Sequence, residues 1–194
     1  MNWIRIVLKD SLELRDVERL AAYNTSWSQY AFTPYSENEM YRVAWETDGD
    51  ATTIQYIQDP RMGVRYFLLS GVGIDTAAAF IRKRLATYSD SDIADLLQTA
   101  QTTEDRELAV LHAGVAAPAE YDATYAGYLQ QALSDAEPLV RQAAVEAAVA
   151  MGWPQLRPPL EQLAQGDPVA TVRQYADQAL VSLRKHSWAA APPA

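Results

Sequence analysis

The 194-residue chain contains no cysteine, and this absence removes several kinds of chemistry at once. Without thiols there can be no disulfide framework, no thiolate metal site and no cysteine nucleophile. The two histidines, His112 and His186, are too far apart in the sequence to form the i,i+4 pair of a helical zinc site. A Gly71-x-Gly73 segment follows an apolar run, but Thr76 occupies the third glycine position of a dinucleotide-binding loop. The sequence therefore predicts no metal, no cofactor and no catalytic residues.

Long apolar runs are also missing. No stretch of 18 apolar residues is present, so we expect no membrane partner and no membrane-spanning helix. The opening segment MNWIRIVLKD has only a short apolar run before Lys9 and Asp10, which is not the pattern of a signal peptide. We therefore expect a cytoplasmic protein of bacterial type.

Basic residues are few. The chain has 16 of them against 25 acidic residues, which gives a net charge of -9 and a pI near 4.7. Such a surface repels nucleic acid, and the one basic cluster, Arg82 to Arg84, would spread around a helix rather than form a stripe. We expect no nucleic-acid partner. An acidic surface fits a basic protein partner, although it also serves ordinary solubility.

The C-terminal half repeats itself. The segment DAEPLVRQAAVEAAVAMG, residues 135–152, aligns with DPVATVRQYADQALVSLR, residues 167–184, and 7 of the 18 positions are identical. Apolar residues recur at helical spacing in both copies, and a weaker copy lies upstream, where Arg106 precedes Arg141 by 35 positions. Helical patterns also precede each copy, in residues 89–100, 119–133 and from about Pro158. A period in the thirties with two helices per unit predicts a helical solenoid.

The pattern Asp-x-x-x-x-Val-Arg-x-x-Ala resembles the HEAT repeat, in particular the short HEAT-like repeats of phycobilin lyase subunits. The resemblance is carried by Asp135 to Ala144 and Asp167 to Ala176, and the first copy departs from it because Ala100 replaces the aspartate. It implies that the aspartate lies in the turn between paired helices and that Asp and Arg alternate along the stack. We expect Arg141 and Arg173 to pair with acidic or carbonyl groups at these turns, and these residues to set the fold rather than form a site.

The N-terminal half has a different pattern. Residues WIRIVL, YRVAWET, ATTIQYIQ and VRYFLLSG predict strands, LRDVERLAAY predicts a helix, and turn signals lie at Asp48-Gly49 and at DPRMG. The prediction is a β-α-β-β-β α+β domain over residues 1–73. An all-α HEAT-like solenoid is expected over 74–186, and a tail over 187–194.

An aromatic segment interrupts this half. Residues 23–41 contain 6 of the 19 Phe, Trp and Tyr residues, set among Ser, Thr, Asn and Gln. One interpretation is a recognition loop in which Trp27, Tyr30 and Tyr35 anchor a protein partner. The other is a loop that folds back and covers one face of the sheet with its rings.

These features favour a non-enzymatic, cytoplasmic protein-binding module of adaptor or immunity type. The resemblance leaves an alternative, an enzyme-associated subunit that handles a chromophore as phycobilin lyases do. It also implies that the second helix of each repeat lines the concave face of the stack. A protein partner, possibly basic, is therefore expected to contact the polar positions of these helices, which are Gln142, Glu146, Gln174, Asp177 and Gln178.

Overall fold

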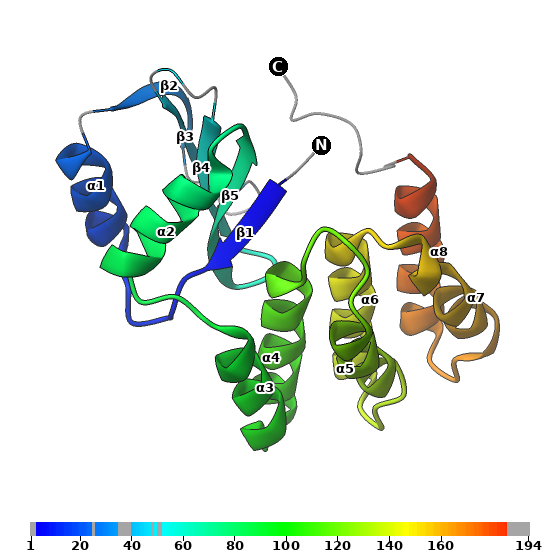
Figure 1. The fold of residues 1–194 in the computed structure, drawn as a ribbon. Coiled ribbons are helices and arrows are strands. Elements are labelled where there is room, and N and C mark those ends of the chain that lie inside the picture. Colours follow the sequence, from blue (N-terminus) through cyan, green and yellow to red (C-terminus); the bar gives the residue numbers. More distant parts are fainter. Residues whose placement is uncertain (1–2, 25, 35–39, 48, 50–51, 186–194) are drawn as a thin grey trace. The chain divides into compact units, whose positions relative to one another are not determined.

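The structure, a computed structural model, describes all residues except 1–2, 25, 35–39, 48, 50–51 and 186–194. The chain forms two compact units, Met1–Ser89 and Asp90–Ala194 (Figure 1). The first is an antiparallel sheet with helices, and the second contains helices and no strand among its described residues, so the predicted α+β domain followed by a helical repeat region is confirmed. The predicted tail lies outside the described residues.

The described residues of the sheet unit form five strands, where the sequence predicted four. Its elements are β1 (Trp3–Val7), α1 (Leu14–Tyr23), β2 (Trp27–Thr33), β3 (Tyr41–Thr47), β4 (Thr52–Asp59), β5 (Val64–Gly71) and α2 (Ile74–Arg84). The strand order is β1-β5-β4-β3-β2, and every neighbouring pair is antiparallel. The additional strand, β2, is an edge strand formed by the aromatic segment that the sequence analysis treated as a loop.

Both helices of this unit pack on one face of the sheet. The strand register places Val43 opposite Tyr56, Tyr56 opposite Phe67 and Phe67 opposite Ile6, so these four side chains form one row across the sheet. They share a buried core with residues of both helices, which are Val17, Leu20, Ile74, Ala77, Ala78 and Ile81. Burial of this row against α1 and α2 supplies the apolar core of the unit.

Helix α2 therefore belongs to the sheet unit. The sequence predicted that residues 74–84 belong to the solenoid, with a boundary after residue 73. In the structure α2 packs on β1 and β5, and Ile81 is fully buried in the same core as the strands. Leu85 joins this core and Leu8 bridges to Thr87, so the compact unit extends to Ser89.

The helical unit consists of three helix pairs in sequence. Its elements are α3 (Asp90–Thr99), α4 (Thr103–Ala116), α5 (Ala123–Leu133), α6 (Pro138–Met151), a short 3-10 turn (Pro154–Leu156), α7 (Arg157–Gly166) and α8 (Ala170–Lys185). The second helices stack, α4 against α6 and α6 against α8, while each packs on the first helix of its own pair. The three predicted helix pairs are confirmed, and α7 begins one residue before Pro158.

Helices α4 and α6 approach each other very closely at Gly114. Ala144, Ala147 and Ala148 of α6 are completely buried, and Gly114 of α4 lies against the backbone of Ala147. A methyl group added at Gly114 would lie 2.6 Å from the Cα atom of Ala147, which is far inside contact distance. The absence of a side chain at Gly114 therefore sets the separation of the first two repeats.

Candidate functional site

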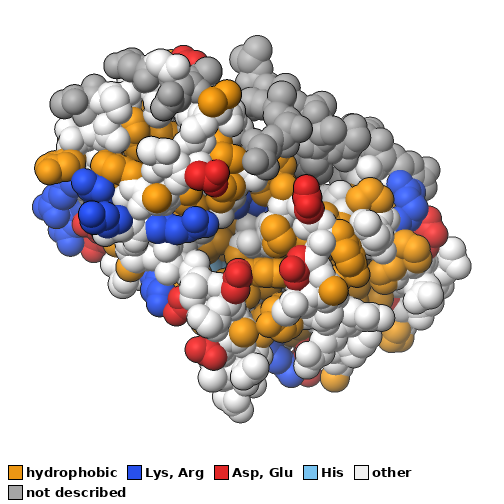
Figure 2. Space-filling model, viewed as in Figure 1, with side chains coloured by type: hydrophobic (Ala, Val, Ile, Leu, Met, Phe, Trp, Pro, Cys, Tyr) orange, Lys and Arg blue, Asp and Glu red, His pale blue; other side chains and the backbone are white. Residues whose placement is uncertain are grey.

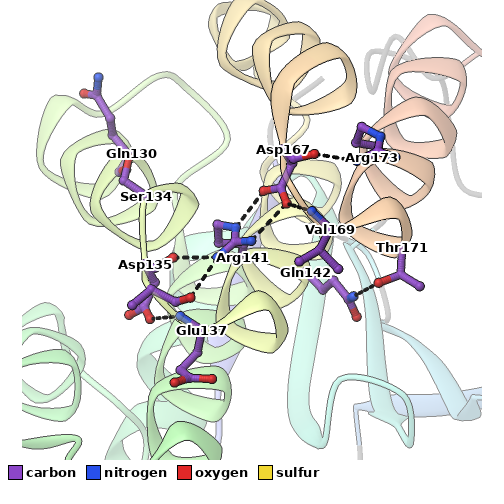
Figure 3. A network of polar contacts seen from close by, with 11 residues as sticks. Gln130, Ser134, Asp135, Glu137, Arg141, Gln142, Asp167, Val169, Thr171 and Arg173 are labelled. Carbon is purple, nitrogen blue, oxygen red and sulfur yellow. Dashed lines mark hydrogen bonds and ion pairs between the residues drawn. The ribbon is translucent and has the colours of Figure 1, made fainter.

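A ladder of arginine and aspartate side chains joins consecutive helix pairs (Figure 3). Arg141 Nε lies 2.7 Å from Asp167 Oδ2 and its Nη2 donates to Asp167 Oδ1 at 2.9 Å, a bidentate pair between the second repeat and the third. The remaining Nη1 donates to the carbonyl oxygens of Asp135 and Ala136 within its own repeat. The expected pairing of Arg141 and Arg173 at the turns is confirmed, since Arg173 Nη1 also donates to the Asp167 carbonyl at 2.6 Å.

Asp167 has a second structural role beside its ion pair. Its Oδ1 also accepts a hydrogen bond from the Val169 backbone N–H at 2.8 Å, which fixes the turn that leads into α8. The hydrogen bonds from Arg141 are the main cause that holds the pKa of Asp167 below its usual value. Both side chains of the pair are almost fully buried, so this contact is part of the solenoid interior rather than a binding surface.

The first rung of the ladder is weaker. Nη2 of Arg106, on α4, lies 3.5 Å from Asp135 Oδ1, and 35% of the Arg106 side chain is exposed. Ala100 stands where the turn aspartate of this first repeat would be, but the rung from Arg106 is made with the aspartate of the next repeat, as it is for Arg141. The HEAT pattern is thus followed across repeats even where it is incomplete within one.

The exposed and half-buried positions along one side of α4, α6 and α8 form what we name the second-helix face. The name covers Glu104, Glu107 and Leu111 of α4, Leu139, Gln142, Glu146 and Val149 of α6, and Thr171, Gln174, Asp177, Gln178 and Val181 of α8. Spacings of three and four residues put those of each helix on one side. Of the predicted partner-binding residues, Gln174, Asp177 and Gln178 are exposed, and Gln142 and Glu146 are half-buried. Their role in binding stays a prediction.

Gln142 also links two repeats. Its Nε2 donates to Thr171 Oγ1 at 2.9 Å, which joins α6 to α8 across the face. This hydrogen bond restricts the Gln142 side chain, so a further contact of its amide group would cost little additional side-chain entropy.

Negative charge is concentrated in the helical unit. Residues 90–194 contain 14 acidic and 6 basic residues, a net charge of -8 out of the chain's -9. Burial raises the pKa of Glu107, and the charge of Glu104 raises it further. On the side drawn in Figure 2, acidic side chains are spread over the helical unit, whereas one group of basic side chains lies over α1 and α2.

Apolar side chains lie beside these charges. Leu139 on α6 is 54% exposed, Val181 on α8 is 47% exposed and Tyr175 is 39% exposed. Exposed apolar groups set among polar ones are the composition of many protein-binding surfaces, in which apolar anchors are surrounded by a polar rim. Leu139, Gln142 and Glu146 show this mixture along a single helix.

The aromatic segment is divided between core and surface. The half-buried Trp27 packs its ring 6.0 Å from that of Trp45 and 5.6 Å from that of Phe80, measured between ring centroids. Tyr30 lies at an irregularity in the pairing of β2 with β3, and 57% of it is exposed. Tyr35 lies outside the described residues. The structure therefore does not bring Trp27 and Tyr30 into one exposed cluster, and a partner contact at either stays a prediction.

These different environments predict different effects of truncation. Trp27→Ala is expected to lower the free energy of unfolding of the sheet unit by about 1–2 kcal/mol, because it removes two aromatic contacts. Tyr30→Ala is the matched control on the same strand, with an expected change within about 0.5 kcal/mol, as for most exposed residues. Denaturant unfolding of both variants, followed by circular dichroism, gives the comparison. Equal losses in the two variants would contradict this assignment.

Residues 91–181 match the family model of HEAT repeats, and the match does not extend into the sheet unit. The helical unit is thus a HEAT-repeat module, the class of helical fold that commonly mediates protein interactions. No curated protein and no solved structure matches the chain. Among the described residues, no helix is long and apolar enough to cross a membrane. Within the same part of the chain, no three or more His, Asp or Glu residues are grouped as a metal site requires.

Proposed function

We propose that this protein is a non-enzymatic adaptor or immunity-type protein that binds a basic protein partner through the second-helix face. The observation that carries the proposal is the charge of the HEAT unit, where 14 acidic residues stand against 6 basic ones. A patch of one sign steers association with a partner of the opposite sign and suppresses binding to others. The exposed apolar groups of the same face, Leu139 and Val181, would supply anchors.

A basic partner would also relieve the crowding of the acidic groups. Glu107 is half-buried, and burial together with the charge of Glu104 raises its pKa, so its charged form is less favourable than that of an exposed glutamate. A cationic side chain placed between the two would stabilise the charged form. Basic residues of the partner are then expected to contact the acidic side chains of α4, and also Glu146 and Asp177.

Charge reversal on the second-helix face tests the proposal. The double variant Glu146→Lys, Asp177→Lys is expected to weaken partner binding at least about tenfold, because it replaces attraction by repulsion at two positions. The matched control is Glu120→Lys, Glu161→Lys, which makes the same change of charge before α5 and on α7, away from this face. Partners captured from a lysate of the source organism and then purified are titrated by calorimetry at two salt concentrations.

The wild type is expected to bind more weakly as salt rises, since exposed charge pairs are screened within about 8 Å at physiological ionic strength. Two results would count against the proposal. One is affinity that does not depend on salt, and the other is equal weakening by the control variant, which would show only an effect of net charge.

A further inference from the structure

An aromatic cavity lies in the sheet unit, whereas the features that support the proposed function belong to the helical unit. It has a volume of about 400 Å³ and is open to solvent. Helix α1 forms one wall, and strands β2 and β3 form the other. Its lining includes the rings of Trp27, Phe32, Tyr41 and Trp45, with Glu18 and Gln29 as its polar residues.

The strand geometry explains why so many rings meet there. Tyr41, Val43 and Trp45 alternate along β3, so all three point to the face of the sheet that α1 covers. Trp45 lies opposite Gln29 of β2, and Phe32 lies opposite Val43, so the neighbouring strand adds its own side chains to the same face. Phe32 and Tyr41 meet edge to face, with 5.6 Å between their ring centroids.

Glu18 is the acidic residue of the cavity lining. The neighbouring arginines of α1 are engaged elsewhere, Arg15 with Glu13 at 3.1 Å and Arg19 with Asp16 at 3.8 Å. Among the described residues Glu18 has no ion-pair partner. Burial raises the pKa of Tyr41, and the charge of Glu18 raises it further, so the carboxylate acts on the ring that lines the cavity.

We propose that this cavity binds a small organic cation, an ammonium group carried on a short apolar body. The faces of aromatic rings attract cations, and tryptophan and tyrosine do so most strongly. A carboxylate without a partner adds a full negative charge at the same place. The volume lies within the range of small-molecule sites, about 300–1,000 Å³.

The same aromatic cluster already holds a cation at another edge. The Arg84 guanidinium lies 3.8 Å from the ring centroid of Phe80, and Phe80 packs against Trp27. The same guanidinium lies 5.4 Å from the ring centroid of Tyr23. The cavity side of Trp27 offers a cation the same kind of ring surface, with Glu18 in addition.

Choline and 3,3-dimethylbutan-1-ol are a suitable pair of probes, because they have the same shape and differ in a positively charged nitrogen against a neutral carbon. Both are titrated into the full chain while the indole N–H signals of Trp27 and Trp45 are followed by nuclear magnetic resonance. Choline is expected to shift both signals saturably and to bind at least about tenfold more tightly than the neutral alcohol.

Two variants test the source of the preference. Glu18→Gln removes the charge of an exposed side chain, so the fold is expected to persist, and the preference for choline should fall severalfold while binding of the alcohol stays the same. Glu46→Gln is the matched control, because Glu46 is exposed on β3 but outside the cavity lining, and it should leave the preference unchanged. Equal affinity for the two probes, no shift with either probe, or a Glu18→Gln variant that keeps the full preference would each overturn the proposal.

Discussion

Replacing Arg141 by alanine is expected to lower the free energy of unfolding of the helical unit by about 3–5 kcal/mol. The guanidinium makes two hydrogen bonds to the Asp167 carboxylate and two to the backbone carbonyls of Asp135 and Ala136. In the intact pair the Asp167 side chain is only 3% exposed, so removal of Arg141 takes away the guanidinium that binds a buried carboxylate. A buried charge without a partner costs far more than the intact pair contributes, which is why truncation of one member has a large effect.

The measurement is denaturant unfolding at neutral pH, followed by far-ultraviolet circular dichroism. Arg173→Ala is the matched control, because Arg173 stands at the same position of the next repeat but is half-buried and donates to the backbone carbonyl of Asp167. Its expected cost is about 1 kcal/mol, the usual contribution of a single hydrogen bond. An Arg141→Ala variant that unfolds at the same denaturant concentration as the wild type would refute the structural role of the ladder.

Acid titration gives an independent check on the same pair. The folded-state pKa of Asp167 is lowered, so its contribution to stability is present above the unfolded value of about 3.9 and is lost as pH falls through the folded value. Arg141 is the principal cause of the lowered pKa. The loss of stability of the wild type below about pH 4 should therefore be steeper than that of Arg141→Ala.

The sequence was most informative in the C-terminal half, where each repeat must meet the same packing and hydrogen-bonding requirements. The period between Asp135 and Asp167 predicted the paired helices, and the resemblance to HEAT repeats implied the turn aspartates and the arginines that bind them. It could not show that the buried ion pair joins Arg141 to the aspartate of the next repeat, while the aspartate of its own repeat offers a carbonyl. That choice depends on how far the stacked helices stand apart, which is a property of packing in three dimensions.

Strand β2 was missed for a different reason. The WSQYAFT segment places polar residues between rings, and it lies beside Pro34 in a region rich in turn formers. Aromatic residues favour strands, and that signal was present, but an edge strand satisfies only one side with hydrogen bonds and tolerates polar residues. The cavity against α1 could not be anticipated, because it exists only when β2 pairs with β3 and brings Trp27 beside Trp45.

The position of α2 also depended on packing. Its sequence, with Ile74, Ala77, Ala78 and Ile81 at helical spacing, fits a solenoid helix as well as a helix that covers a sheet. The two possibilities differ only in what the apolar stripe meets, and the structure shows that it meets β1 and β5. Periodicity thus predicted the helix but not the unit to which it belongs.

A substitution at Gly114 is expected to have the second large effect on stability. The sequence did not predict a structural role for this residue either. Val149 and Val181 occupy the corresponding positions of the other two repeats, so the repeat pattern gives no reason to expect a glycine there. The structure supplies the reason, because a Cβ atom at residue 114 would lie 2.6 Å from both the Cα and the Cβ atoms of Ala147. Since the first of these two atoms belongs to the backbone, rotation of a side chain cannot relieve the clash.

Gly114→Ala is therefore expected to lower the free energy of unfolding of the helical unit by about 3 kcal/mol, the upper part of the usual range for overpacking. The matched control is Gly127→Ala in α5, where no atom lies within 4 Å of the added methyl group. There the substitution should raise stability by about 0.5–1 kcal/mol, because alanine is the better helix former. The same change of residue is thus expected to have opposite signs at two helical positions of one unit. If Gly114→Ala also stabilises the protein, then α4 and α6 are not packed as closely as described, and the stacking of the first two repeats must differ.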